Sequence, residues 1–185
     1  MSTALLLMDF QNGIAGRPGF EPAIESASRA LAAARGAGMP VVFIRVAFRD
    51  GYPEVSSNNK AFSQIAGSAG DSMHADSPAT QVVDALAPEA GEQVVVKKRF
   101  SAFAGNDLEM LLRARRIDHL VLGGVSTSGV VLSTVRQAGD LDFGLTVLSD
   151  ACADSDQEVH RILLDQVFPR QATVTTVDEW VGTRG

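Results

Sequence analysis

Six short apolar runs recur along this chain, and helical patterns occupy most of the segments between them. The first run, ALLLMD, is almost continuously apolar, as a strand covered on both faces must be. The runs cover residues 4–9, 40–46, 93–97, 119–125, 144–150 and 172–177. Helical patterns cover 21–37, 79–86, 106–117, 128–140 and the segment that starts at the Ser155/Glu158 capping pair. This alternation predicts an α/β fold, a three-layer α/β/α sandwich with a six-stranded, mainly parallel, Rossmann-like sheet.

The length and composition bound the class of protein. With 185 residues, of which 45% are hydrophobic, the chain suits one domain spanning 1–185. The net charge of −6 and the scattered cations argue against nucleic-acid binding. The apolar run near the N-terminus is too short to cross a membrane and has no basic residues before it. The single cysteine, Cys152, excludes an internal disulfide, so we expect a cytoplasmic protein.

Residues 47–78 form the longest segment without a clear period. Gly, Ser, Asp and Asn are frequent in it, and such a segment in a compact domain is usually a lid, a binding loop or an oligomer contact. The three histidines, His74, His119 and His160, show no ligand spacing, so we expect no metal.

Chemistry-bearing residues follow several of the predicted strands. In open parallel sheets, ligands bind beyond the carboxyl ends of the strands, near the point where strand order reverses. That rule selects Asp9, Lys97, the stretch 125–130 and Asp150 as candidate site residues. Two of these, Asp9 and Lys97, carry opposite charges.

Asp9 ends an otherwise apolar strand, where partial desolvation raises the pKa of a carboxyl group unless a cation offsets it. Lys97 is the candidate cation, and such a pair can move a proton or stabilise a developing anion. The alternative is that Asp9 only caps the turn that follows it, DFQNG, through hydrogen bonds to nearby backbone. The alternative for Lys97 is that it belongs to a solvent-exposed basic segment, because Lys98 and Arg99 follow it directly.

Residues 122–135, LGGVSTSGVVLSTV, pass from a strand through small residues into a helix. In this elbow, the backbone N–H groups from Ser126 to Val130 are candidates to bind an anionic or carbonyl oxygen. The alternative is a plain helix start capped by Thr127 or Ser128.

Four segments together resemble the isochorismatase-like hydrolase superfamily, which includes the cysteine hydrolases. They are LLLMDFQNGI, KKRFSAF, GVSTSGVVLSTVRQA and VLSDACA, and the resemblance runs in order from residue 4 to about residue 175. It implies hydrolysis of a small molecule without an organic cofactor, in a homo-oligomer (dimer or tetramer). It also implies that Asp9 and Lys97 are catalytic, and that the peptide bond between Val125 and Ser126 is cis.

The chain departs from this pattern at Val130, which stands where the cysteine hydrolases carry their nucleophile. Valine cannot form a covalent intermediate, so three interpretations stay open. The first is a hydrolase without a nucleophile, as in true isochorismatases, where an aspartate protonates an enol ether. The second is a non-catalytic protein that binds a small molecule. The third is a hydrolase that uses Cys152, although a lone cysteine is more often a small buried residue.

The remaining predictions concern binding. We expect no membrane or nucleic-acid partner and no cofactor. The candidate substrate-binding residues are Gln11, Arg99, Phe103, Val125, Ser126, Thr127 and Val130.

Overall fold

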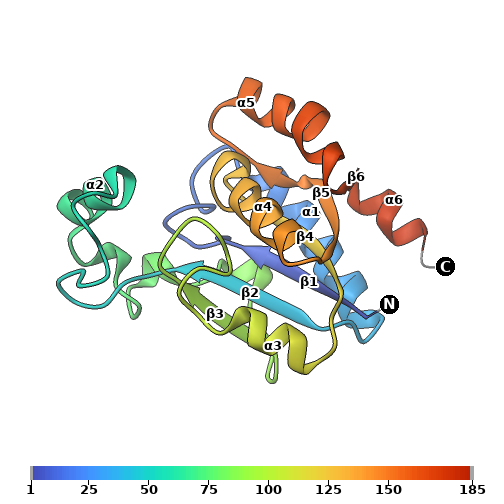
Figure 1. Cartoon of the computed structure of the whole chain (residues 1–185), viewed down its shortest axis with the longest axis horizontal. Helices are drawn as coiled ribbons and strands as arrows, with labels where there is room; N and C mark the ends of the chain where they lie inside the picture. Colours follow the sequence, from blue (N-terminus) through green and yellow to red (C-terminus); the bar gives the residue numbers. More distant parts are fainter. Residues whose placement is uncertain (1, 184–185) are drawn as a thin grey trace.

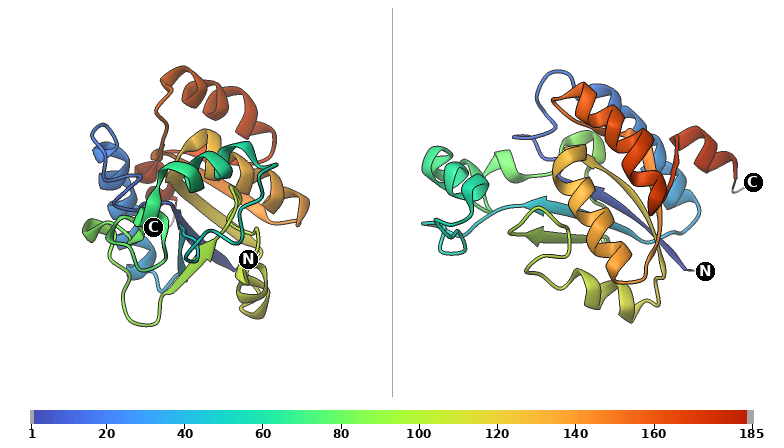
Figure 2. Two further views of the ribbon diagram at one scale, coloured as in Figure 1. Left: turned by 90° about the vertical axis from the view of Figure 1, so that its left-hand side faces the viewer. Right: turned by 45° about the horizontal axis from the view of Figure 1, so that its top comes forward.

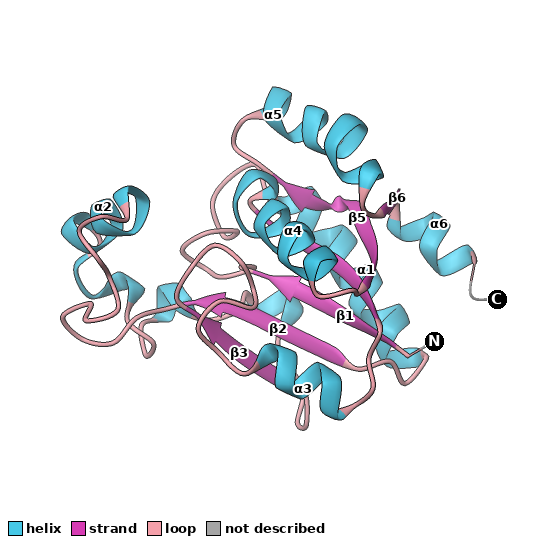
Figure 3. Cartoon of the chain, viewed as in Figure 1, coloured by secondary structure: helices cyan, strands magenta, loops and turns pink. Residues whose placement is uncertain are grey.

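The structure, a computed structural model, describes residues 2–183 and contains one six-stranded sheet. The strand order is β3-β2-β1-β4-β5-β6, and every pairing is parallel (Figures 1 and 3). The strands are β1 (Thr3–Met8), β2 (Val41–Val46), β3 (Gln93–Lys97), β4 (His119–Val125), β5 (Gly144–Ala153) and β6 (Thr173–Thr175). The predicted α/β fold with a parallel six-stranded sheet is therefore confirmed.

Helices cover both faces of this sheet. The α-helices are α1 (Glu21–Gly36), α2 (Lys60–Ser68), α3 (Leu108–Ala114), α4 (Leu132–Asp140), α5 (Gln157–Ile162) and α6 (Val177–Gly182). Strand β1 shows why the sheet needs a layer of helices on each face, because its side chains alternate between two apolar cores. Ala4, Leu6 and Met8 pack with α3 and α4, whereas Leu5 and Leu7 pack with α1 and α6.

The strand order reverses between β1 and β4, which lie side by side at the centre of the sheet. Gly124 near the end of β4 allows this close contact. A Cβ atom on Gly124 would lie 2.9 Å from the carbonyl oxygen of Met8, closer than packed atoms tolerate. The residues that follow the two strands, Asp9 and the elbow, are thus held together at the reversal point, where ligands bind in such sheets.

The segment 47–78 is more ordered than its sequence suggests. It contains α2, whose first turn is capped by Asn59, with Oδ1 accepting from the N–H of Phe62 at 3.2 Å. Phe62 packs against Phe48 and is the only buried side chain of α2, so the helix lacks the repeated apolar spacing by which a helix is recognised in sequence. The helix (teal in Figures 1 and 2) projects beyond the carboxyl end of the sheet.

Other boundaries also differ from the sequence predictions. The short helix expected at 79–86 is a pair of 3-10 turns, Pro78–Thr80 and Asp84–Leu86. The N-cap of α5 is Asp156 rather than Ser155, because the Asp156 carboxylate accepts from two N–H groups of the first turn. The last strand ends at Thr175, and α6 follows with a capping box formed by Thr176 and Glu179.

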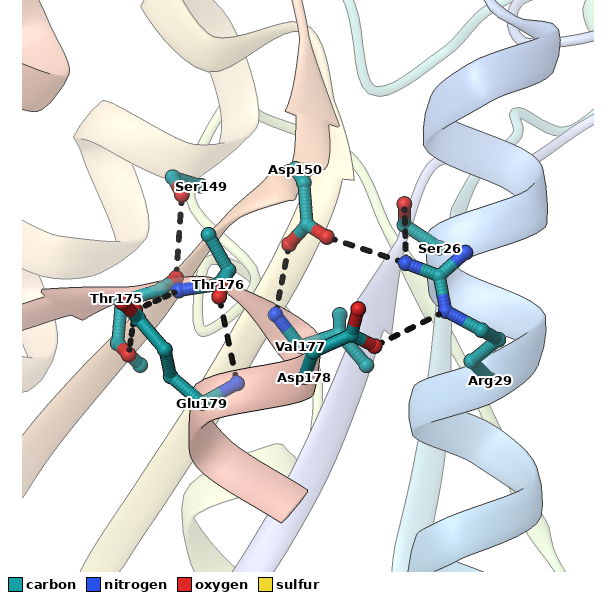
Figure 4. A network of polar contacts seen from close by, with 9 residues as sticks. All are labelled: Ser26, Arg29, Ser149, Asp150, Thr175, Thr176, Val177, Asp178 and Glu179. Atoms are coloured by element: carbon teal, nitrogen blue, oxygen red, sulfur yellow. Dashed lines mark hydrogen bonds and ion pairs between the residues drawn. The ribbon is translucent and has the colours of Figure 1, made fainter. Parts of the chain in front are cut away.

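Strand β5 extends to Ala153, three residues further than expected, so Asp150 does not stand at the strand end. Its carboxylate holds the C-terminal helix α6. Oδ1 accepts from the N–H of Val177 at 2.8 Å, and Oδ2 pairs with Arg29 at 3.3 Å (Figure 4). Arg29 also pairs with Asp178, so this network joins α1, β5 and α6 and is structural. The prediction that Asp150 ends this strand is wrong.

Candidate active site

A cavity of about 810 Å³ opens at the carboxyl ends of the central strands. Its walls come from the loop after β1, the end of β3, the elbow after β4, the residues after β5, and α2. Five residues predicted from the sequence line it: Asp9, Lys97, Val125, Ser126 and Val130. Phe62 and Ile65 of α2 and the half-exposed Phe100 add apolar walls.

Asp9 and Lys97 form a buried ion pair in the wall of this cavity. Nζ of Lys97 lies 2.9 Å from Oδ2 of Asp9, and the side chains are only 2% and 7% exposed. Lys97 also donates to the carbonyl oxygen of Arg99 at 2.9 Å. The other carboxylate oxygen, Oδ1 of Asp9, is buried and has no hydrogen-bond partner within residues 2–183. The side chain therefore makes none of the backbone bonds that a turn cap would make.

Opposing effects act on the Asp9 carboxyl group. Burial raises its pKa, and the neighbouring Lys97 ammonium lowers it again through its charge and hydrogen bond. Burial dominates, so the pKa of Asp9 lies above its usual value of 3.8. A carboxyl group of this kind, next to a fixed cation and with one free oxygen, can both give and accept a proton.

The elbow has the expected chain path but fewer free donors than expected. The peptide bond between Val125 and Ser126 is cis. The N–H of Ser128 donates to Oδ2 of Asp154 at 2.7 Å, and the N–H of Gly129 donates to the carbonyl oxygen of Ser126 at 3.2 Å. These two amides are occupied within the protein, so the full set from Ser126 to Val130 is not available to a ligand.

Asp154 is a site residue that the sequence reasoning missed. It follows the last residue of β5, is 4% exposed, and lines the cavity beside the elbow. Burial works to raise its pKa, but N–H groups from Ser128, Asp156 and Ser155 outweigh burial and lower it. The sequence SDACADS contains the signal for this residue, because a strand that runs three residues further ends next to Asp154 instead of at Asp150.

Four other predicted binding residues do not line the cavity. Gln11 is fully buried, and its amide bonds to the backbone of Val46 and Thr80. Arg99 donates to the carbonyl oxygens of Lys98 and Glu54. Phe103 packs in the core, and the hydroxyl of Thr127 lies 2.8 Å from Nδ1 of His160. The predicted role of these four residues in lining the cavity is therefore not seen in the structure.

The single cysteine does not serve this cavity. Cys152 pairs with Gly124 across β4 and β5, is 4% exposed and packs in the core. Burial raises the pKa of its thiol to about 12, so it stays protonated at neutral pH. A hydrolase based on Cys152 needs the sulfur to face the cavity, and Cys152 is not among the lining residues.

Within residues 2–183, His, Cys, Asp and Glu form no group of three or more that suits a metal ion. In the same range, no helix has the length and apolar character needed to span a bilayer.

The chain belongs to the isochorismatase family, whose domain matches residues 3–179. It is 34% identical to the isochorismatase family protein YecD of Escherichia coli O157:H7, over 96% of this chain and 94% of that protein. It is 31% identical to the ureidoacrylate amidohydrolase RutB of Stutzerimonas stutzeri (strain A1501), over 97% of this chain and 77% of that protein. The N-carbamoylsarcosine amidase structure from Thermoplasma acidophilum is 30% identical, with a TM-score of 0.78 over 96% of this chain and 98% of that one. The family predicted from the sequence is confirmed, and it is a family of hydrolases.

Proposed function

We propose that this protein hydrolyses a small molecule in the cavity without a covalent intermediate, with Asp9 as the proton donor and acceptor. The observation that carries the proposal is that Oδ1 of Asp9 is buried and has no hydrogen-bond partner within residues 2–183, although Asp9 lines the cavity. An unsatisfied buried polar atom costs about 1–3 kcal/mol. A substrate or water bonded to Oδ1 would remove that cost.

Enol-ether hydrolysis suits this pair of residues. Asp9, in its protonated form, transfers its proton to the terminal vinyl carbon, which leaves an oxocarbenium ion. A water molecule adds to the cationic carbon and returns a proton to Asp9, and the resulting hemiketal breaks into a ketone and an alcohol. The net change is the addition of one water. Lys97 stabilises the carboxylate that exists between the two proton transfers.

Val130 argues against the covalent route in this chain. Its side chain lines the cavity at the elbow and has no nucleophilic atom. The relatives named as an amidohydrolase and an amidase therefore support a hydrolase, but their substrates are not assigned to this protein. A cytoplasmic homo-oligomer, with specificity supplied by residues 47–78 and by neighbouring subunits, stays a prediction.

The experiment is to measure pyruvate release from isochorismate by the wild-type protein, with intact-protein mass recorded during turnover. The proposal predicts release with no mass adduct. A covalent adduct would contradict the non-covalent route. An absence of release would remove this substrate and favour the alternative, a non-catalytic protein that binds a small molecule.

A further inference from the structure

The charges in the cavity wall are unevenly compensated. Asp9 and Lys97 neutralise each other at 2.9 Å. Asp154 lies on the elbow side of the same cavity, and no Lys or Arg within residues 2–183 forms an ion pair with it. Arg17, the other charged residue of the lining, is exposed in the loop between β1 and α1. The elbow wall therefore carries a fixed negative charge.

Backbone N–H groups hold the Asp154 carboxylate in place. Oδ2 accepts from the N–H of Ser128 at 2.7 Å, and Oδ1 accepts from the N–H of Asp156 at 3.2 Å. Together with further donors from Ser128 and Ser155, these bonds fix the orientation of the carboxylate beside the cavity. The backbone donors also keep it ionised, because they lower its pKa.

We propose that Asp154 is a specificity-determining residue, which binds a hydroxyl, amide or ammonium donor of the substrate and disfavours an anionic oxygen beside the elbow. The inference rests on the proposed function, since it takes the cavity to be the place where the substrate binds. It reverses the role that the sequence suggested for the elbow. Two of the amides that would bind an anion there are already used, and one of them is used by Asp154 itself.

Three probes of similar shape and different charge test this inference: benzamidine, benzamide and benzoate. Their dissociation constants are measured by calorimetry with the wild type and with Asp154→Ala and Asp154→Asn. Loss of a charge-assisted hydrogen bond predicts about tenfold weaker binding of benzamidine to both variants. Benzoate is expected to bind the variants more tightly than the wild type.

Two variants are used because an asparagine amide would turn one N–H toward a backbone N–H that the carboxylate now accepts, whereas alanine adds no donor. Thermal unfolding verifies that each variant is folded. Asp118→Asn is the matched control: Asp118 is exposed, precedes β4 at its amino end and does not line the cavity. The control should bind all three probes as the wild type does.

The inference is overturned if benzamidine binds the folded Asp154 variants as tightly as the wild type, or if none of the probes binds the wild type. Its failure can be told apart from failure of the proposed function. Charge selection by Asp154 without any turnover would keep the inference and remove the proposed reaction. Turnover together with probe binding that does not depend on the Asp154 charge would keep the proposed reaction and remove the inference.

Discussion

The carboxylate of Asp9 and the ammonium of Lys97 meet at 2.9 Å although their strands are not neighbours. Asp9 follows β1 and Lys97 ends β3, with β2 between them. Adjacent strands lie about 4.8 Å apart, so the lysine side chain must cross a neighbouring strand to reach the carboxylate. A long cation ending β3 is therefore a geometric requirement of the site, and its loss should have consequences for stability.

Replacement of Lys97 by methionine should destabilise the fold. The change leaves the buried Asp9 carboxyl group without its cation, and the expected loss in unfolding free energy is about 3 kcal/mol. Urea denaturation at neutral pH measures it. Lys60→Met is the control, because Lys60 is exposed at the start of α2 and should change stability by less than about 0.5 kcal/mol. Equal effects of the two substitutions would contradict the account.

Asp9 should also make stability depend on pH. In the folded protein its pKa is raised by burial, so the folded state keeps this proton to higher pH than the unfolded state, whose pKa is near 3.8. The stability that Asp9 contributes is present below that value and is lost as pH rises through the folded pKa. Asp9→Asn removes this loss. The unfolding free energy of the variant relative to the wild type should therefore increase from about pH 4 upwards. Parallel pH profiles in urea denaturation would show that the pKa is not raised.

Much of the fold could be predicted because apolar runs and helical spacing report burial directly. β1 and β4 are examples, since their runs are continuous and end at polar or small residues. The helix α2 could not be predicted this way. Phe62 is its only buried side chain, so it has no apolar stripe, and its start depends on one capping bond from Asn59.

The site was predictable where side chains carry the chemistry and less so where backbone contacts do. Asp9 and Lys97 follow from the rule on strand ends. That rule does not predict that Gln11 stays out of the cavity, because its amide forms hydrogen bonds with backbone groups far along the chain, at Val46 and Thr80. Asp154 was missed because the end of β5 was set three residues too early.

A thiol introduced at the elbow should react where the native one does not. In the wild type at pH 8, Cys152 has a pKa of about 12, so roughly one molecule in ten thousand carries a thiolate. Iodoacetamide should leave the folded wild type unmodified. Val130→Cys should be labelled at residue 130, because this residue, although only 2% exposed, lines the cavity and Cys152 does not, at a stability cost of about 1 kcal/mol. Peptide mass spectrometry locates the label, and rapid labelling of native Cys152 would contradict the burial described.

A methyl group at Gly124 should disturb the contact between β1 and β4. The added Cβ would lie 2.9 Å from the carbonyl oxygen of Met8 and 3.0 Å from its Cβ, so Gly124→Ala should cost about 2 kcal/mol. Gly67→Ala in α2 is the matched control, since no atom lies within 4 Å of its added Cβ and alanine favours a helix. Thermal denaturation should show a lower midpoint for the first variant only. A tolerated alanine at Gly124 would mean that the strands are not packed this closely.

The most direct test of the central claim is the rate of pyruvate release from isochorismate by Asp9→Asn compared with the wild type. An asparagine keeps the size of the side chain but cannot deliver or take up the proton. The account predicts that the wild type turns the substrate over and that turnover falls at least about a hundredfold in the folded variant. Turnover that survives in Asp9→Asn would contradict the assignment of Asp9 as the proton donor.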